Sequence, residues 1–83
     1  MASKTQLQEY VLKVVAELTS IAPSDIGGND RLREDLGLDS LQSMEMLSRV
    51  SEEFNIDPDM EEVMKLNTVE EVINSLSRVL GAN

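Results

Sequence analysis

The sequence predicts a small all-α fold, a four-helix bundle with three longer helices, one short third helix and a long loop between the first two. Apolar residues recur at helical spacing in three long stretches. Hydrophobic residues make up 41% of the 83 residues but aromatics only 2%, so the core must be aliphatic, which favours helices over a sheet. No cysteine is present to cross-link the chain. We expect residues 1–83 to form a single domain without a second unit or repeats.

The first helix is expected from about Thr5 to Thr19. Ser3 or Thr5 can cap it, because each has a glutamine three residues later. Its predicted core positions repeat at helical spacing: Leu7, Val11, Val14, Val15 and Leu18.

Residues 20–38 contain Pro23 and the pair Gly27-Gly28, which forbid a continuous helix. The segment is long for a connection, but four apolar residues can anchor it across the bundle, with a helical turn expected over 31–36. These anchors are Ile21, Ile26, Leu32 and Leu36.

The second helix is expected from Ser40 or Leu41 to Phe54, where Asn55 can end it. Its predicted inward residues are Leu41, Met44, Leu47, Val50 and Phe54.

A short third helix is expected from about Pro58 to Lys65. Asp57 would be its cap and Pro58 its first residue. Its predicted buried residues are Met60, Val63 and Met64.

Thr68 and Glu71 form a capping box that predicts the start of the last helix. Its apolar stripe is Val69, Val72, Ile73, Leu76, Val79 and Leu80.

The stretch Gly37-Leu38-Asp39-Ser40-Leu41 joins the long loop to the second helix. Gly37 can adopt positive φ, and Asp39 or Ser40 can cap the helix; with Asp39 as cap, Gln42 would complete a capping box. Ser40 then stands at the positive end of the helix dipole, where an attached phosphate would be stabilised. The simpler interpretation is that Ser40 only helps to cap the helix.

The run Glu34-Asp35-Leu36-Gly37-Leu38-Asp39-Ser40-Leu41, followed by Glu45 and by Glu52-Glu53-Phe54, resembles the attachment segment of acyl carrier proteins. The resemblance extends from about Thr5 to Leu80. It implies that Ser40 carries phosphopantetheine, transferred from coenzyme A by a phosphopantetheinyl transferase, and that acyl groups travel as thioesters on this arm. It further implies that Asp39 assists the transferase, although capping is an equally physical role.

The residue types argue against catalysis by this chain alone. Without histidine or cysteine, zinc sites of the usual kind and histidine-partnered nucleophiles are excluded, and the carboxylates fall mostly on exposed helix faces. A carrier needs only one exposed hydroxyl, which a separate enzyme modifies. We therefore expect no enzyme activity and no metal site.

The net charge of −9 argues against nucleic acid or an anionic membrane as partner and favours basic protein surfaces. The resemblance implies that these belong to an acyltransferase, a ketosynthase or a related acyl-processing enzyme. Acidity that only keeps the domain soluble is the plainer alternative. The expected docking residues are Asp35, Leu41, Met44, Glu45 and Glu52.

Flexible methionines in the second and third helices could line an expandable pocket for a tethered acyl chain, or they could only fill gaps in the core. The candidate pocket residues are Met44, Leu47, Val63 and Met64.

Gln42 stands where fatty-acid carriers usually place an acidic residue, and Arg49 and Ser51 dilute the acidic face further. This mixed surface favours a polyketide or other specialised pathway over general fatty-acid synthesis. The rival hypothesis is an acidic helical module that binds a partner without covalent cargo. No apolar run is long enough for a membrane span or a signal peptide, so we expect a cytoplasmic protein. We also expect a free-standing carrier, because the chain has natural-looking ends, and we expect it to be a monomer.

Overall fold

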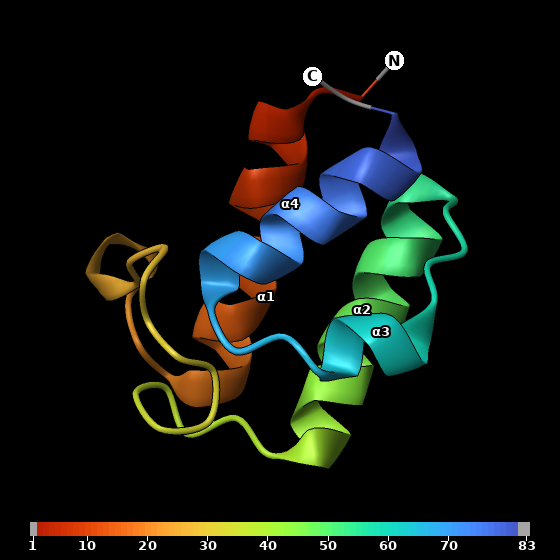
Figure 1. The fold of residues 1–83 in the computed structure, drawn as a ribbon. Coiled ribbons are helices and arrows are strands. Elements are labelled where there is room, and N and C mark those ends of the chain that lie inside the picture. Colours follow the sequence, from red (N-terminus) through yellow and green to blue (C-terminus); the bar gives the residue numbers. More distant parts are fainter. Residues whose placement is uncertain (1, 82–83) are drawn as a thin grey trace.

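The structure is a computed structural model that describes residues 2–81 as helices joined by loops. The elements in chain order are α1 (Lys4–Thr19), a 3₁₀ turn η1 (Pro23–Asp25), α2 (Ser40–Phe54), α3 (Met60–Met64) and α4 (Val69–Leu80). Figure 1 shows α1 and α2 running in opposite directions, α4 crossing them obliquely, and short α3 beside α2. The predicted all-α bundle of three longer helices and one short third helix is confirmed.

All three longer helices begin with a capping box, in which a side chain at the cap and one three residues later each accept a backbone N–H. The pairs are Ser3–Gln6, Asp39–Gln42 and Thr68–Glu71. Because Ser3 rather than Thr5 caps α1, that helix starts at Lys4. Each cap of this kind stabilises a helix by about 1 kcal/mol. The second box fixes where α2 begins.

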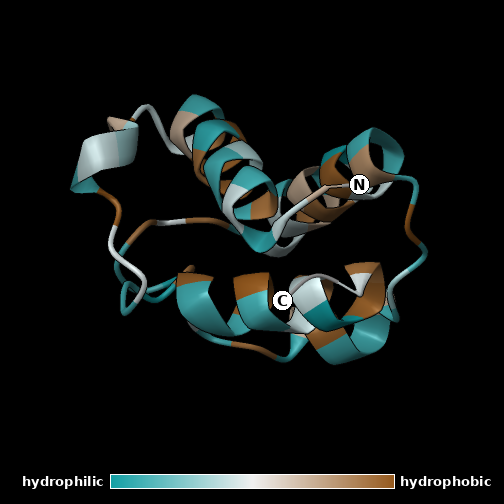
Figure 2. Cartoon of the chain, turned by 90° about the horizontal axis from the view of Figure 1, so that it is seen from above, coloured by the Kyte–Doolittle hydropathy of each residue, from teal (hydrophilic) through white to brown (hydrophobic). Residues whose placement is uncertain are grey.

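The core lies between the helices, and Figure 2 shows their hydrophobic residues turned toward one another with hydrophilic residues outside. Leu47, Val50 and Leu76 have no exposed surface. The other buried apolar side chains are Leu7, Val11, Val14, Val15, Ile26, Leu32, Leu36, Leu38, Met46, Val63, Val69, Val72 and Ile73. The core is therefore aliphatic, as the composition predicts.

The long loop is tied to the segment that leads into α4. The Leu32 N–H donates to the Asn67 carbonyl at 2.8 Å, and the Val69 N–H donates to the Asp30 carbonyl at 3.1 Å. The expected helical turn over 31–36 is present only as hydrogen-bonded turns, not as a helix. Leu38, which was not among the predicted anchors, is buried at the end of the loop and donates its N–H to the Leu32 carbonyl at 2.8 Å. This end of the loop delivers the chain to α2.

The predicted start of the third helix is wrong. Asp59, not Asp57, is the cap of α3, and its side chain accepts the Glu62 N–H at 3.3 Å. Pro58 is buried before the helix instead of forming its first residue. Two aspartates flank the proline, and α3 begins after the second one.

The predicted inward face of α2 is also partly wrong. Leu41 is 76% exposed and Met44 is 51% exposed, whereas Met46 is buried. An α-helix turns by about 100° per residue, so steps of three residues drift by about 60° each. Leu41 therefore lies on the opposite side of α2 from Val50, and the buried face is centred on Met46, Leu47 and Val50.

Candidate functional site

Ser40 is the first residue of α2, and it is exposed. Before it, Gly37 has a φ of 74°, the left-handed conformation that the sequence predicted there. Asp39 follows in an extended conformation as the cap. The chain thus turns at Gly37, buries Leu38 and presents the Ser40 hydroxyl at the head of the helix.

Asp39 accepts the Gln42 N–H at 2.7 Å, while the Gln42 Oε1 accepts the Asp39 N–H at 3.2 Å. Gln42 also donates from Nε2 to the Leu18 carbonyl at 3.3 Å, which ties the start of α2 to the end of α1. A glutamate at this position could still accept the Asp39 N–H, but it has no side-chain N–H to donate to the Leu18 carbonyl. Gln42 therefore has a structural role that an acidic residue would lose.

Arg33 lies against Ser40. Its Nη2 donates to the Ser40 Oγ at 2.9 Å across seven residues of chain. Arg33 was not among the predicted site residues, because its position in the loop has no periodicity that would place it beside α2. Both groups are exposed, so the contact is formed at the surface.

Asp35 is paired with Arg31 in the same loop. Its Oδ2 accepts the Arg31 backbone N–H at 2.7 Å and the Arg31 Nε–H at 3.3 Å. The hydrogen bond from the guanidinium, with that from the backbone, holds the pKa of the Asp35 carboxyl below its ordinary value. Asp35 is exposed, and the neighbouring Arg31 guanidinium compensates part of its charge.

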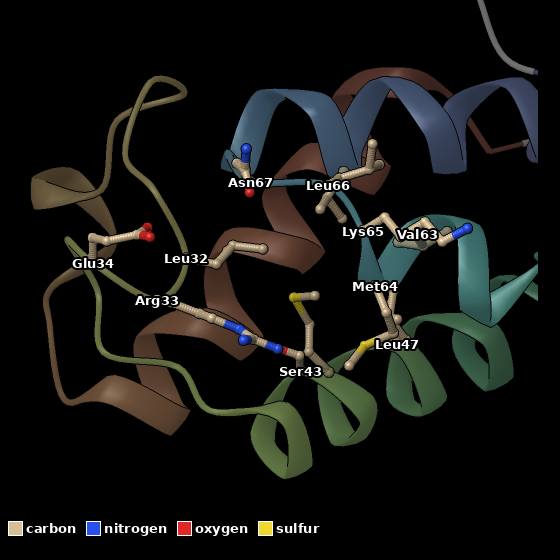
Figure 3. A pocket seen from close by; sticks show the side chains of 12 residues that line it. Leu32, Arg33, Glu34, Ser43, Leu47, Val63, Met64, Lys65, Leu66 and Asn67 are labelled. Carbon is tan, nitrogen blue, oxygen red and sulfur yellow. The ribbon is translucent and has the colours of Figure 1, made fainter.

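A cavity of about 260 Å³ opens between α2, α3, the loop and the start of α4, and Figure 3 shows the side chains that line it. Three of the four predicted pocket residues, Leu47, Val63 and Met64, are among them. Met44 is not. Met46 lines the cavity instead, and its spacing of four residues before Val50 on the buried face is the signal that could have identified it.

Met44 contributes to a second, shallow apolar hollow on the surface of α2 and α3, with Met60 and Met64. Leu41, one turn before Met44, extends this exposed apolar surface along α2. The acidic residues Glu45 and Glu52 are exposed on the same helix. The predicted docking residues on α2 are thus all accessible.

Arg49 leaves this acidic face and turns toward α1. Its Nη2 lies 2.7 Å from the Glu17 Oε2, and the two side chains are 34% and 47% exposed. The hydrogen bond from Arg49 lowers the pKa of Glu17. Because the Arg49 charge is paired with α1, it reduces the acidity of α2 less than the sequence suggests.

Comparison with known proteins identifies the family of this chain. Residues 9–76 match the family described as "Phosphopantetheine attachment site". The chain belongs to this family. An acyl carrier protein of Thermosynechococcus vestitus is 31% identical over 96% of this chain and 99% of its own length. An acyl carrier protein of Rickettsia bellii is 32% identical over 89% of this chain and 86% of its own length.

A segment of a non-reducing polyketide synthase, sorB of Penicillium rubens, is also similar, at 34% identity over 95% of this chain. That match covers only 3% of the synthase. Membership of the phosphopantetheine attachment family implies a covalently bound phosphopantetheine group.

The residues at the start of α2 fit the phosphate of such a group. Ser40 offers an accessible oxygen, Arg33 places a guanidinium 2.9 Å from it, and the helix directs the positive end of its dipole to the same place. Phosphopantetheine would supply the thiol on which a thioester can form.

Other chemistry finds less support in the structure. Within residues 2–81, no group of three or more His, Cys, Asp or Glu side chains is placed to hold a metal ion. None of the helices described combines the length and hydropathy needed to cross a bilayer.

Proposed function

We propose that this chain carries acyl intermediates as thioesters on a phosphopantetheine arm attached to Ser40, and delivers them to enzymes of polyketide or fatty-acid-type biosynthesis. The observation that carries the proposal is the exposed Ser40 hydroxyl at the first residue of a capped helix, in a chain of the phosphopantetheine attachment family. A non-covalent interaction module, the alternative, gives no reason for this family match.

Attachment requires one transfer step, which a phosphopantetheinyl transferase catalyses. The Ser40 oxygen attacks the phosphorus that bears the pantetheine, the phosphoanhydride bond of coenzyme A breaks, and adenosine bisphosphate leaves with the bonding electrons. A base on the transferase takes the Ser40 proton, since the carrier has no histidine. Ser40 is thus a substrate rather than a catalytic group, and thioester chemistry belongs to the arm and the partner enzymes.

Intact-mass measurement after coexpression with a phosphopantetheinyl transferase tests the attachment. We expect the chain to gain the mass of one phosphopantetheine, and Ser40→Ala to abolish the gain. Ser48→Ala is the matched control, because Ser48 is an exposed serine on the same helix but is not at its start. An unmodified wild-type chain, or an arm that still attaches to Ser40→Ala, would refute the proposal.

The docking surface for partner enzymes is α2 with its exposed apolar and acidic side chains, Leu41, Met44, Glu45 and Glu52, and Asp35 before it. The apolar residues supply contact area, while the carboxylates steer the encounter with basic residues of a transferase, acyltransferase or ketosynthase. Asp35 contributes least, because Arg31 compensates its charge.

The carrier acts as a monomer in the cytoplasm.

The rate of association with such an enzyme checks this surface. Replacing Glu45 and Glu52 by glutamine should slow association and flatten its dependence on ionic strength. An unchanged salt dependence in the double variant would place docking elsewhere.

The cavity of about 260 Å³ is the candidate acyl pocket, with Leu47, Val63 and Met64 in its lining and Met46 added to the predicted set. Methionine side chains adapt their shape easily, so the cavity can widen around an inserted chain. Cargo protection checks this role: an acyl thioester on the arm should hydrolyse faster when Val63→Phe narrows the cavity. Equal hydrolysis rates would leave these residues as core packing only.

A further inference from the structure

Arg33 differs from two other arginines of this chain in what it bonds to. Arg31 and Arg49 each form an ion pair with a carboxylate, to Asp35 and Glu17 respectively. These are the ion pairs found in residues 2–81, and Arg33 takes part in neither. Its Nη2 bonds instead to the neutral Ser40 Oγ at 2.9 Å. The positive charge of Arg33 therefore lies beside the attachment oxygen, and no carboxylate of residues 2–81 forms an ion pair with it.

Esterification of Ser40 would place an anion where the hydroxyl proton had been. The Oγ becomes a bridging ester oxygen, which is a weaker acceptor, while the two non-bridging oxygens of the phosphodiester, two bonds away from Oγ, share a negative charge. A guanidinium binds such oxygens with charge-assisted and often bidentate hydrogen bonds, which are stronger than a bond to a hydroxyl. Arg33 needs only a small side-chain movement to exchange one partner for the other.

The position of the Arg33 side chain also bears on where the phosphopantetheine arm would lie. Its side chain is one of those that line the cavity beside α2 and α3, and Figure 3 shows it extending from the loop toward the start of α2. Arg33 thus lines the cavity and also reaches the Ser40 hydroxyl. A phosphate bound to Arg33 would therefore stay next to a residue that lines the cavity.

We propose that Arg33 is the phosphate-positioning residue of the phosphopantetheine-bearing form: its guanidinium pairs with the phosphodiester on Ser40 and holds the root of the arm beside the cavity. The inference rests on the proposed function, because it needs the arm on Ser40. Arg33 takes no part in bond making; it sets how much of the time the arm lies against the protein. Loss of the pair frees the arm to the solvent.

Phosphorus NMR of the arm-bearing protein tests this directly. The compared proteins are wild type, Arg33→Gln, Arg33→Lys and Arg78→Gln, with the urea-unfolded wild type as the reference for a free arm. Arg78→Gln is the matched control, since it removes the same charge from the last turn of α4, at the other end of the bundle. Intact mass first confirms that each protein bears the arm.

The ³¹P resonance of Arg33→Gln should narrow and shift toward the free-arm position, while Arg78→Gln should match wild type. For an exposed pair of this kind we expect the ratio of held to free arm to fall about two- to five-fold. Arg33→Lys should lie between, because an ammonium keeps the charge but not the planar fork. Added salt should release the wild-type arm in the same way and change Arg33→Gln little.

An Arg33→Gln resonance identical to wild type, or a wild-type resonance insensitive to salt, would overturn the inference while leaving Ser40 as the attachment residue. A wild-type chain that gains no arm would instead refute the proposed function. If Arg33→Gln cannot be loaded by the transferase, the salt response of the wild-type arm decides the question.

Discussion

Gly37 controls how the chain approaches Ser40. Its φ of 74° lies in the left-handed region, and among the described residues no heavy atom beyond Gly37 and its two chain neighbours lies within 4 Å of the position that a Cβ would take. Any cost of a side chain at this position is therefore a backbone cost rather than a clash. The glycine makes the turn that buries Leu38 and brings Asp39 to the head of α2.

We predict that Gly37→Ala destabilises the protein by about 1–2 kcal/mol, the usual cost of a left-handed L-residue. Urea unfolding would measure it. Gly27→Ala is the control, since its φ lies outside the left-handed region and a Cβ would meet Asp30 only at ordinary contact distance, 3.8 Å. Its stability should change by less than about 0.5 kcal/mol. Equal effects of the two substitutions would contradict the backbone argument.

At the residue scale, what could be predicted from the sequence is what depends on near neighbours. The positive φ of Gly37 and the Asp39–Gln42 pair follow from residue types a few positions apart, and both predictions are confirmed. Arg33 could not be found this way. Its contact with Ser40 depends on how the loop folds back, and that path is set by contacts with the segment before α4.

At the scale of the element, the head of α2 combines two roles that one aspartate could serve. Asp39 caps the helix by accepting the Gln42 N–H, and family resemblance implies that its carboxylate also assists the transferase, through a metal. Asparagine is as good a cap as aspartate, but it lacks the negative charge with which a carboxylate holds a divalent cation. The two roles can therefore be separated by two substitutions at one position.

We predict that Asp39→Ala lowers the free energy of unfolding by about 1 kcal/mol, while Asp39→Asn leaves it nearly unchanged. Thermal or urea unfolding would measure both. If the carboxylate assists transfer, Asp39→Asn should still slow arm attachment, measured as the initial rate of mass gain. An asparagine variant that is loaded at the wild-type rate would leave capping as the whole role of Asp39.

The faces of the helices show where pattern reading succeeds and where it fails. In α4 one apolar stripe is present, and its first four members, Val69, Val72, Ile73 and Leu76, are buried as predicted. In α2 apolar residues occupy more than one face, so a run of three-residue steps connects Leu41 to Val50 although they lie on opposite sides. The extra apolar residues are the exposed ones, and in a carrier they are available for docking.

For the molecule as a whole, an aliphatic core holds a strongly charged chain in a small volume. The described residues span 30 × 26 × 19 Å, and the long loop is kept in place mainly by backbone hydrogen bonds to the entry of α4 and by its buried leucines. The all-α class and the helix order follow from composition and periodicity. The path of the loop depends on contacts between distant segments, which no local pattern records.

The net charge of −9 within this volume predicts a fold that is sensitive to salt. Sixteen acidic residues face seven basic ones, so most carboxylates repel one another at low ionic strength. Added salt or a divalent cation screens this repulsion more in the compact state than in the expanded one, and should raise the melting temperature. A gain of 1 kcal/mol would correspond to about 4–8 °C for a domain of this size.

Replacing exposed Glu52 and Glu53 by glutamine should raise the low-salt melting temperature and reduce its salt dependence. A wild-type melting temperature that is unchanged between low and moderate ionic strength would show that repulsion between the carboxylates does not destabilise the folded state.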